Sequence, residues 1–288
     1  QYVDHMIKNY DYKDMVYLSD DEMREVTGSD TYYGGSYDEA EAHCHPLNYA
    51  LGIAKAALSA GAKIYENSPA TSYKVLDDHV RVNTKNGSIK ADRIVLACNG
   101  YLENLEKSLT SKILPMNNYI VATKPLDDET VQKINPKDIA FADSRFVINY
   151  FRMSADKRLL FGGGENYSQE LSKNIVPIVT RPLEKIYPFL KGIKIDYAWG
   201  GKLAITMNRL PFFASLHNEK VISAQGYSGQ GVALASYSGK IVSEKITGTG
   251  EVFDIMSKIP RPSFPGGRFL RNPSMKIGML YYSLLDRI

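Results

Sequence analysis

One stretch of the chain, residues 221–248, restricts the possible folds most strongly, because a strand, a glycine-rich turn and a helix follow one another there. Residues 221–224 are apolar or small, residues 226–231 hold three glycines, and residues 232–247 continue as a helix that stops at Gly248. Glycines let the main chain approach a ligand closely, and the free N–H groups of a helix N-terminus favour an electron-rich or anionic group. The order predicts a backbone cradle for a ligand, with a tight structural turn as the alternative.

The residues of this turn argue against three common kinds of site. No Lys-Ser/Thr pair follows Gly231, so the turn is not a phosphate-binding P-loop, and no third glycine completes a dinucleotide fingerprint. Ser228 is followed directly by a glycine, one place too early for the nucleophile turn of a serine hydrolase. The pattern alone therefore leaves the ligand open.

Two kinds of strand pattern divide the rest of the chain. Residues 94–98 form a continuous apolar run that ends in Asn99-Gly100, which is typical of a parallel strand covered on both faces with ligands near its carboxyl end. Residues 119–123, 146–152 and 159–164 are rich in aromatic and β-branched residues, and no helix separates the last two, which predicts antiparallel pairing. We therefore expect a mixed α/β fold in which a doubly wound part is joined to an antiparallel sheet.

Shorter patterns predict further elements. In chain order they are a helix from His45-Pro46 to Gly61, strands at 63–66 and 72–76, a hairpin over 80–91, a helix over 176–190 broken near Pro182 and Pro188, and a docked helix over 278–285.

Composition excludes several classes of function. The net charge is only +3 and no block of Lys and Arg stands out, which argues against nucleic acid as a partner. No apolar run approaches the length of a membrane span. The two cysteines and five scattered histidines form neither a disulfide framework nor a metal site, so we expect no metal and a reducing, cytoplasmic location.

Several motifs in this order resemble the D-amino-acid oxidase family of flavoenzymes, and the resemblance covers nearly the whole chain. They are His45-Pro46, residues 92–101 (DRIVLACNGY), residues 143–146 (DSRF) and residues 226–231 (GYSGQG). Three further segments resemble the gamma-glutamylputrescine oxidoreductase branch of that family: residues 118–123, 158–165 and 259–267.

The resemblance implies a domain plan and a cofactor, noncovalently bound FAD. The plan has five segments: 1–42 as a substrate-domain or connecting segment, 43–112 as part of the FAD-binding domain, 113–195 as the antiparallel substrate domain, 196–250 as a second part of the FAD-binding domain with the flavin-ring cradle, and 251–288 as a C-terminal tail. Family members also begin with a strand, a Gly-x-Gly-x-x-Gly turn and a helix for the pyrophosphate. Nothing here matches that unit, so we expect this chain to correspond to the later part of such an enzyme and to be inactive alone.

The resemblance also implies site residues, with no catalytic acid or base among them, because a neutral amine can give up a hydride to flavin directly. The expected cofactor contacts are Ala70, Ala97, Cys98, Asn99, Gly100, Gly226, Tyr227, Ser228, Gly229, Gln230 and Gly231, and the expected substrate contacts are Tyr119, Tyr150 and Trp199.

Positions at which this sequence differs from related enzymes restrict the class of substrate, which we expect to be a small-molecule amine. Leu203 stands where glycine oxidase has the arginine that anchors a substrate carboxylate, which favours an amine carbon without a carboxylate. Gly201 stands where sarcosine oxidases attach flavin through cysteine, and Leu160 where they have an oxygen-activating lysine. The alternatives are an oxidase or dehydrogenase of N-methyl or D-amino acids, and a noncatalytic protein without FAD. The electron acceptor and the oligomeric state stay open.

Overall fold

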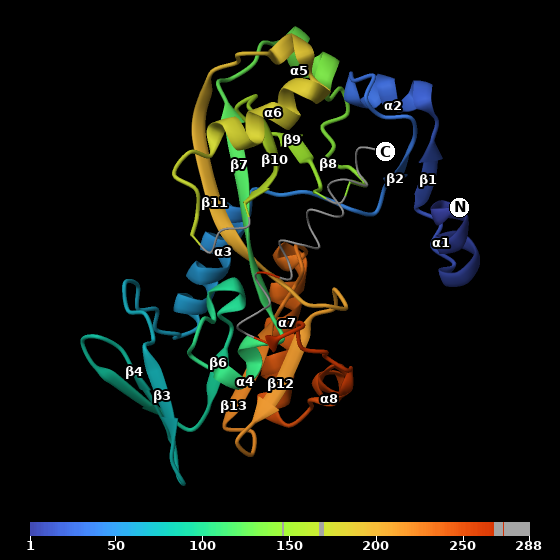
Figure 1. The fold of residues 1–288 in the computed structure, drawn as a ribbon. Helices are drawn as coiled ribbons and strands as arrows, with labels where there is room; N and C mark the ends of the chain where they lie inside the picture. The colour runs from blue at the N-terminus through green and yellow to red at the C-terminus, as the bar shows by residue number, and fades with distance from the viewer. Residues whose placement is uncertain (146, 167–169, 268–272, 274–288) are drawn as a thin grey trace.

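The computed structural model describes residues 1–145, 147–166, 170–267 and 273, and it divides into an upper and a lower part (Figure 1). The upper part is built on one antiparallel sheet and the lower part on a smaller sheet with a parallel pair. This combination confirms the mixed fold that the two strand patterns predicted. The helix expected at 278–285 lies outside the described residues.

The upper sheet has the strand order β11-β7-β10-β9-β8, with every neighbouring pair antiparallel. Its strands are β7 (Leu114–Thr123), β8 (Phe141–Ala142), β9 (Tyr150–Met153), β10 (Leu159–Asn166) and β11 (Ile195–Ile205). β11 pairs with β7 along its length, although the expected domain boundary at 195/196 would assign these two strands to different domains.

One face of the upper sheet packs against helices and forms the largest hydrophobic core. Tyr119 and Phe161 from the sheet pack there against Leu183 of α6 (Val176–Ile186), and all three are fully buried. α6 continues through Pro182, contrary to the expected break, and ends before the short 3₁₀ helix η2 (Pro188–Leu190). Helix α5 (Asp128–Ile134) contributes Ile134 to the same core.

The lower sheet carries the strand of the predicted cradle. Its order is β12 (Phe212–Leu216), β13 (Val221–Gln225) and β6 (Ile94–Leu96), and β13 and β6 are parallel. Helices α7 (Gly231–Thr247) and α8 (Glu251–Lys258) cover one face, and residues near α4 (Lys107–Thr110) pack on the other. The predicted cover of residues 94–98 on both faces is wrong: β6 is the edge strand and Val95 is 40% exposed.

A small antiparallel sheet and one long helix flank the lower part. Strands β3 (Ser72–Val75), β4 (Val80–Asn83) and β5 (Ser88–Ala91) form the predicted hairpin and its neighbour. Helix α3 (Pro46–Ser59) begins where predicted, since the His45 ring accepts a hydrogen bond from the Asn48 amide at 3.3 Å. No residue of α3 is buried. The strand predicted at 63–66 is wrong, because this exposed stretch has no strand partner among the described residues.

The N-terminal segment folds onto the upper part. It contains α1 (Tyr2–Tyr10), β1 (Met15–Leu18), α2 (Asp20–Thr27) and β2 (Gly35–Asp38), and β1 and β2 are antiparallel. Ser19 and Glu22 form a capping box at the start of α2. The Tyr187 hydroxyl donates to the carbonyl of Thr27 at 2.9 Å, and this buried bond fixes the end of α2 against the main core.

Candidate functional site

The predicted cradle is present as a strand, a turn and a helix. β13 ends at Gln225, Gly226 to Gln230 form the turn, and α7 begins at Gly231. The turn is held from outside, because the Ser228 amide donates to the carbonyl of Ala204 in β11 at 2.9 Å. It is also held from within by a bond from the Gln230 amide to the Tyr227 carbonyl at 3.0 Å.

The glycines of the cradle differ in how much space surrounds them. Gly226 has φ 75°, and a Cβ atom there would lie 2.7 Å from Thr206 and 3.2 Å from Phe212, so packing as well as backbone conformation requires a glycine. Gly229 has φ 100°, and a Cβ atom there would meet no atom of the other described residues within 4 Å. The cradle is therefore open beside Gly229, on the side where a ligand group would fit.

Helix α7 begins directly at the end of the cradle turn. No side chain of a described residue caps α7, and its first-turn N–H groups lie beside the exposed residues Gly229 and Gln230. The Tyr227 side chain is buried and its hydroxyl donates to the Ala224 carbonyl at 3.0 Å. Burial raises the pKa of Tyr227, so this hydroxyl stays protonated and holds the turn in place.

The second predicted cofactor segment lies directly against the cradle. Asn99 has φ 49°, and its side-chain oxygen accepts a hydrogen bond from the Gly226 amide at 3.1 Å. Gly100 packs so closely on β11 that a Cβ atom would lie 2.6 Å from the carbonyl oxygen of Lys202. The structure thus brings together two of the sequence-predicted segments, which are 127 residues apart.

Three other expected cofactor residues have less direct positions. Ala97 and Cys98 connect β6 to the 3₁₀ helix η1 (Asn99–Tyr101), and Cys98 is half-buried. Burial raises the pKa of the Cys98 thiol, so it is a packed neutral group rather than a nucleophile. Ala70 lies in the exposed stretch before β3, and no hydrogen bond between described residues joins it to the cradle.

The face of the upper sheet opposite the core carries two of the expected substrate residues. A cross-strand row on this face contains Tyr150 of β9, Gly162 of β10, Ile120 of β7 and Trp199 of β11. Trp199 is 44% exposed. A Cβ atom at Gly162 would lie only 2.1 Å from the Tyr150 ring. A glycine at this position therefore makes room for that ring. Two of the three predicted substrate residues therefore share one open face.

The third predicted substrate residue, Tyr119, lies on the opposite face. It is fully buried in the main core, and its hydroxyl accepts a hydrogen bond from the Ser172 amide at 3.0 Å. In its place the open face carries Ile120 and Asn118, and the side-chain oxygen of Asn118 accepts a hydrogen bond from the Tyr150 hydroxyl. Because side chains alternate along a strand, Tyr119 points to one face of β7 while Asn118 and Ile120 point to the other. Only the pairing of β7 with β10 and β11 shows that Asn118 and Ile120 share their face with Tyr150 and Trp199.

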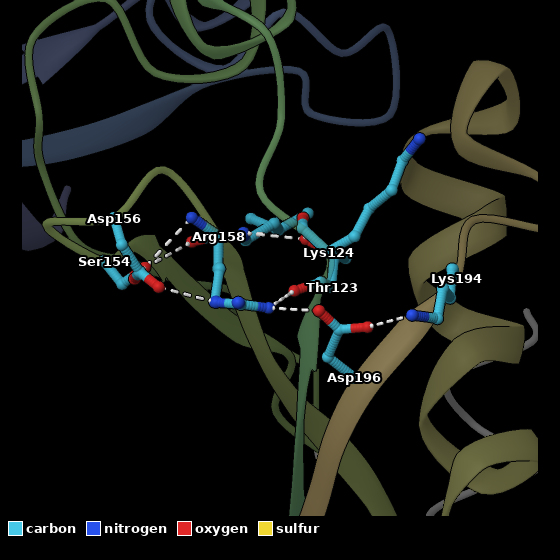
Figure 2. A network of polar contacts seen from close by, with 8 residues as sticks. Thr123, Lys124, Ser154, Asp156, Arg158, Lys194 and Asp196 are labelled. Atoms are coloured by element: carbon cyan, nitrogen blue, oxygen red, sulfur yellow. Dashed lines mark hydrogen bonds and ion pairs between the residues drawn. The ribbon is translucent and has the colours of Figure 1, made fainter.

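A cluster of charged residues at the other end of the sheet serves a structural purpose (Figure 2). Arg158 donates to Asp196 at 2.6 Å, to Asp156 at 2.6 Å and to the Thr123 carbonyl at 2.8 Å. Arg158 and then Lys194 hold the pKa of Asp196 below its usual range. The Nε and Nη1 donors of this guanidinium are engaged by acceptors on three strand ends, so the cluster joins these strands.

The described residues hold no group of three or more His, Cys, Asp and Glu side chains that could bind a metal ion. Within the same residues, no helix is both long and apolar enough to cross a membrane. Both cysteines are free, with Cys44 exposed.

Comparison with known proteins gives the site a chemical context. The sequence model of one family, described as "FAD dependent oxidoreductase" (DAO), matches residues 3–245. The chain is 36% identical to "Probable oxidoreductase OrdL" of Haemophilus influenzae over 97% of its length, and 35% identical to "Gamma-glutamylputrescine oxidoreductase" of Escherichia coli over 98%. It spans 65% and 66% of those two proteins, respectively.

Solved structures with the same fold include the glycine oxidase of Geobacillus kaustophilus. Its TM-score is 0.75 at 19% identity, and the match covers 91% of this chain and 70% of that one. The L-proline dehydrogenase of P. horikoshii matches with a TM-score of 0.66 at 22% identity, covering 81% of this chain and 64% of that one. At such identities the likeness concerns the fold.

Proposed function

This chain belongs to the DAO family of FAD-dependent oxidoreductases, and from that premise we propose that it forms the ring-binding and substrate-binding parts of a flavin-dependent amine oxidoreductase. The observation that carries the proposal is the cradle at residues 226–231, which is open beside Gly229 and leads into a helix that no described side chain caps. The 35% identity to gamma-glutamylputrescine oxidoreductase supports an amine as the substrate.

The described residues fit a flavin at this place. A planar ring needs a surface without side chains, which the open space at Gly229 provides, and it needs hydrogen-bond donors at its electron-rich edge. The first-turn N–H groups of α7 supply those donors, and the dipole of a 17-residue helix adds a positive field. When bound, FAD would accept the hydride from the carbon next to the substrate nitrogen.

The protein's own contribution to the reaction would be binding, orientation and electrostatics. The α7 N-terminus would stabilise negative charge that develops at the cradle during the reaction. Tyr150 and Trp199 on the open sheet face would hold the amine between the sheet and the cradle. No acid–base residue is assigned, because a neutral amine needs none for loss of a hydride.

Three positions support a noncovalent cofactor and a substrate without an α-carboxylate. Gly201 lies near the Tyr101 hydroxyl and has no thiol with which to attach a flavin. Leu203 packs with a small apolar cluster around Leu114 and Ile205 rather than offering a guanidinium. Leu160 pairs with Ala122 in the sheet and supplies no cation that would activate oxygen.

One observation favours the alternative of an amino-acid substrate. Arg152 pairs with Leu160 and is two residues from Tyr150 in β9, so it lies on the same open face. Its guanidinium donates to the Met153 carbonyl at 3.2 Å and keeps further donors for a carboxylate. If amino acids are the substrates, Arg152→Gln should raise KM for them and leave kcat little changed.

The test is to purify residues 1–288 with added FAD, record the flavin absorbance, and measure anaerobic reduction by amines. As expected from the sequence, residues 1–288 should show no turnover as purified. With FAD in excess, we expect weakly bound flavin that gamma-glutamylputrescine reduces faster than glycine, sarcosine or D-alanine. Faster reduction by the amino acids would favour the Arg152 alternative. Colourless protein that still folds would favour the noncatalytic alternative.

The location that we propose is the cytoplasm. The support for this is chemical, because Cys44 is exposed and Cys98 half-buried, and neither is paired. An exposed free thiol persists most readily in a reducing compartment. Fractionation of cells that express the tagged protein would check this.

A further inference from the structure

The outer edge of β11 carries both of the predicted cofactor segments. β11 is an edge strand of the upper sheet, so the backbone groups of every second residue point away from β7. The Ala204 carbonyl accepts a hydrogen bond from the Ser228 amide at 2.9 Å, and the Thr206 amide donates to the Ser228 hydroxyl oxygen at 3.2 Å. The Lys202 amide donates to the Tyr101 hydroxyl oxygen at 3.1 Å. Alternate residues along one strand edge therefore bind the cradle turn and the end of η1.

Ser228 has a side chain at a backbone conformation that favours glycine. Its φ is 51°, in the left-handed region, where glycine is free of the strain that a Cβ atom brings. Asn99, in the other segment, has φ 49°, and its side-chain oxygen accepts the bond from the Gly226 amide. Backbone strain of this kind is concentrated at functional sites, where the surrounding contacts hold it in place. At both positions the side chain that causes the strain also bonds to a neighbouring segment.

The contacts of the Ser228 hydroxyl are with the protein. Besides the Thr206 amide, its oxygen lies 3.2 Å from the Thr206 hydroxyl oxygen and 3.4 Å from the Gly226 carbonyl oxygen. The Cβ position of the next residue, Gly229, is open. The hydroxyl would therefore affect a ligand at the cradle through the position of the turn.

Tyr101 holds the second segment next to the substrate face. The residue is 55% exposed, so packing in a core does not account for the place of its hydroxyl. A Cβ atom at Gly201 would lie 3.7 Å from this hydroxyl oxygen. Gly201 and Trp199 are two residues apart in β11, so they share the open face. The bond from Lys202 thus fixes the segment that ends at Tyr101 beside the face that carries Trp199.

We propose that Ser228 and Tyr101 are positioning residues, which hold the cradle turn and the segment Asn99–Tyr101 in register along the edge of β11. This rests on the proposed function, because these contacts would set the distance from a flavin at Gly229 to the substrate face at Trp199. Neither hydroxyl needs to touch the reacting atoms. Loss of either one would leave the fold intact and let its segment shift relative to Trp199.

Amide hydrogen exchange, measured by NMR, tests this without flavin. The reporter is the Gly226 amide, because its partner Asn99 lies in the other segment and neither substitution removes that partner. Ser228→Gly removes a hydroxyl and relieves the strained backbone, and Tyr101→Phe removes an exposed hydroxyl. We expect the Gly226 amide to exchange about tenfold faster in each variant through local opening, with the urea midpoint little changed. In Ser228→Gly the relieved strain offsets the lost hydrogen bond.

The matched controls make the same chemical changes away from β11. Asn67→Gly relieves a left-handed backbone, φ 54°, in an exposed turn, and Tyr65→Phe removes an exposed hydroxyl. Both should leave exchange at Gly226 unchanged. Unchanged exchange in Ser228→Gly and Tyr101→Phe, or an equal increase in the controls, would overturn the proposal.

With FAD in excess, a positioning role should lower the rate of flavin reduction more than the affinity for flavin. In Ser228→Gly and Tyr101→Phe we expect anaerobic reduction by gamma-glutamylputrescine to slow by about tenfold or more, since small misplacements of reacting groups are costly, while the Kd for flavin changes little. Equal losses of rate, affinity and stability to urea would show a purely structural role and overturn the proposal. If no variant and not the parent chain binds flavin, the proposed function fails, whereas faster exchange at Gly226 would still support the placement of both segments by the β11 edge.

Discussion

Gly226 and Gly229 stand three residues apart in one turn, yet the structure requires a glycine at each for a different reason. At Gly226 any side chain would collide with Thr206 and Phe212. At Gly229 only the backbone conformation is demanding, with φ 100° and open space around the Cβ position. A substitution at Gly226 therefore disturbs the fold, whereas one at Gly229 mainly fills the space offered to a ligand.

The residue-scale prediction that follows concerns Gly229→Val. We expect loss of bound flavin, because the branched side chain would occupy the open side of the cradle, together with about 1–2 kcal/mol of destabilisation from the left-handed backbone. The measurements are flavin absorbance after gel filtration and urea unfolding. Gly248→Val is the matched control, since Gly248 ends the same helix with φ 98° and equally open surroundings.

Equal flavin loss in the two variants would mean that backbone strain, and not the filled cradle, is responsible. If Gly229→Val keeps its bound flavin, Gly229 is not part of the flavin site.

A second residue-scale prediction concerns Asn99, which joins the two cofactor segments. Asn99→Ala removes the acceptor for the Gly226 amide and places alanine at φ 49°, so we expect about 1–3 kcal/mol of destabilisation in urea unfolding. Asn99→Asp keeps an acceptor oxygen and should recover most of that loss. If the aspartate variant is as unstable as the alanine variant, the Asn99–Gly226 bond is not the cause.

At the scale of elements, the ends of the strands are held by side-chain contacts as well as by the backbone hydrogen bonds between neighbouring strands. Arg158 lies at the start of β10 and contacts the turn after β9, the end of β7 and the start of β11 (Figure 2). Both charges of the Arg158–Asp196 pair are largely shielded, with the side chains 16% and 20% exposed. One guanidinium therefore fixes the relative positions of three strands.

The prediction at this scale is a pH-dependent effect of Arg158→Ala. The folded-state pKa values of Asp196 and Asp156 are lowered, so their contribution to stability is fully present above the ordinary aspartate pKa of about 3.9. It is lost progressively as the pH falls from there through the lower folded-state values. Urea unfolding should show a large loss of stability in the variant at pH 7 and a much smaller one at pH 3.

Arg158→Lys should resemble Arg158→Ala, because an ammonium group cannot reach three acceptors in the same geometry. Arg24→Ala is the control: Arg24 pairs with Asp20 and Asp21 on the surface of α2 and should matter little at either pH. If the difference in the free energy of unfolding between Arg158→Ala and the parent chain is the same at pH 7 and at pH 3, the role assigned to the two carboxylates is wrong.

The elements that could be predicted from sequence are those with strong local signals. The helix after His45, the hairpin around residues 80–91 and the cradle helix ending at Gly248 all begin or end at residues with clear turn or cap chemistry. The side of the sheet on which Tyr119 lies could not be predicted, because it depends on strand pairing between distant segments.

At the scale of the whole molecule, the lower part exposes an unusual amount of apolar surface. Leu47, Leu51 and Leu58 of α3 are 61%, 58% and 52% exposed, and Val95 of the edge strand β6 is 40% exposed. Large exposed apolar patches and open strand edges favour association with other chains. Among the described residues, one side-chain hydrogen bond joins α3 to another helix, between Tyr49 and Ser236 of α7.

We therefore predict that residues 1–288 associate with themselves as concentration rises, as measured by light scattering after gel filtration. Replacement of Leu47, Leu51 and Leu58 by lysine should reduce the association without lowering the stability to urea, since none of the three is buried. A monodisperse monomer at every concentration, or unchanged association in the triple variant, would contradict this.

The long ladder of β7 and β11 also decides how the two parts of the molecule can move. Ten residue pairs join these strands, from Ile195 beside the Arg158 cluster to Ile205 next to the cradle. A hinge that opened the upper part away from the cradle would have to break this ladder, since the same two strands belong to both. The upper sheet and the cradle should therefore move as one rigid body, with the distance between Tyr150 and Gly229 nearly constant. Entry of a substrate must then depend on movement of loops at the rim rather than on separation of the two parts.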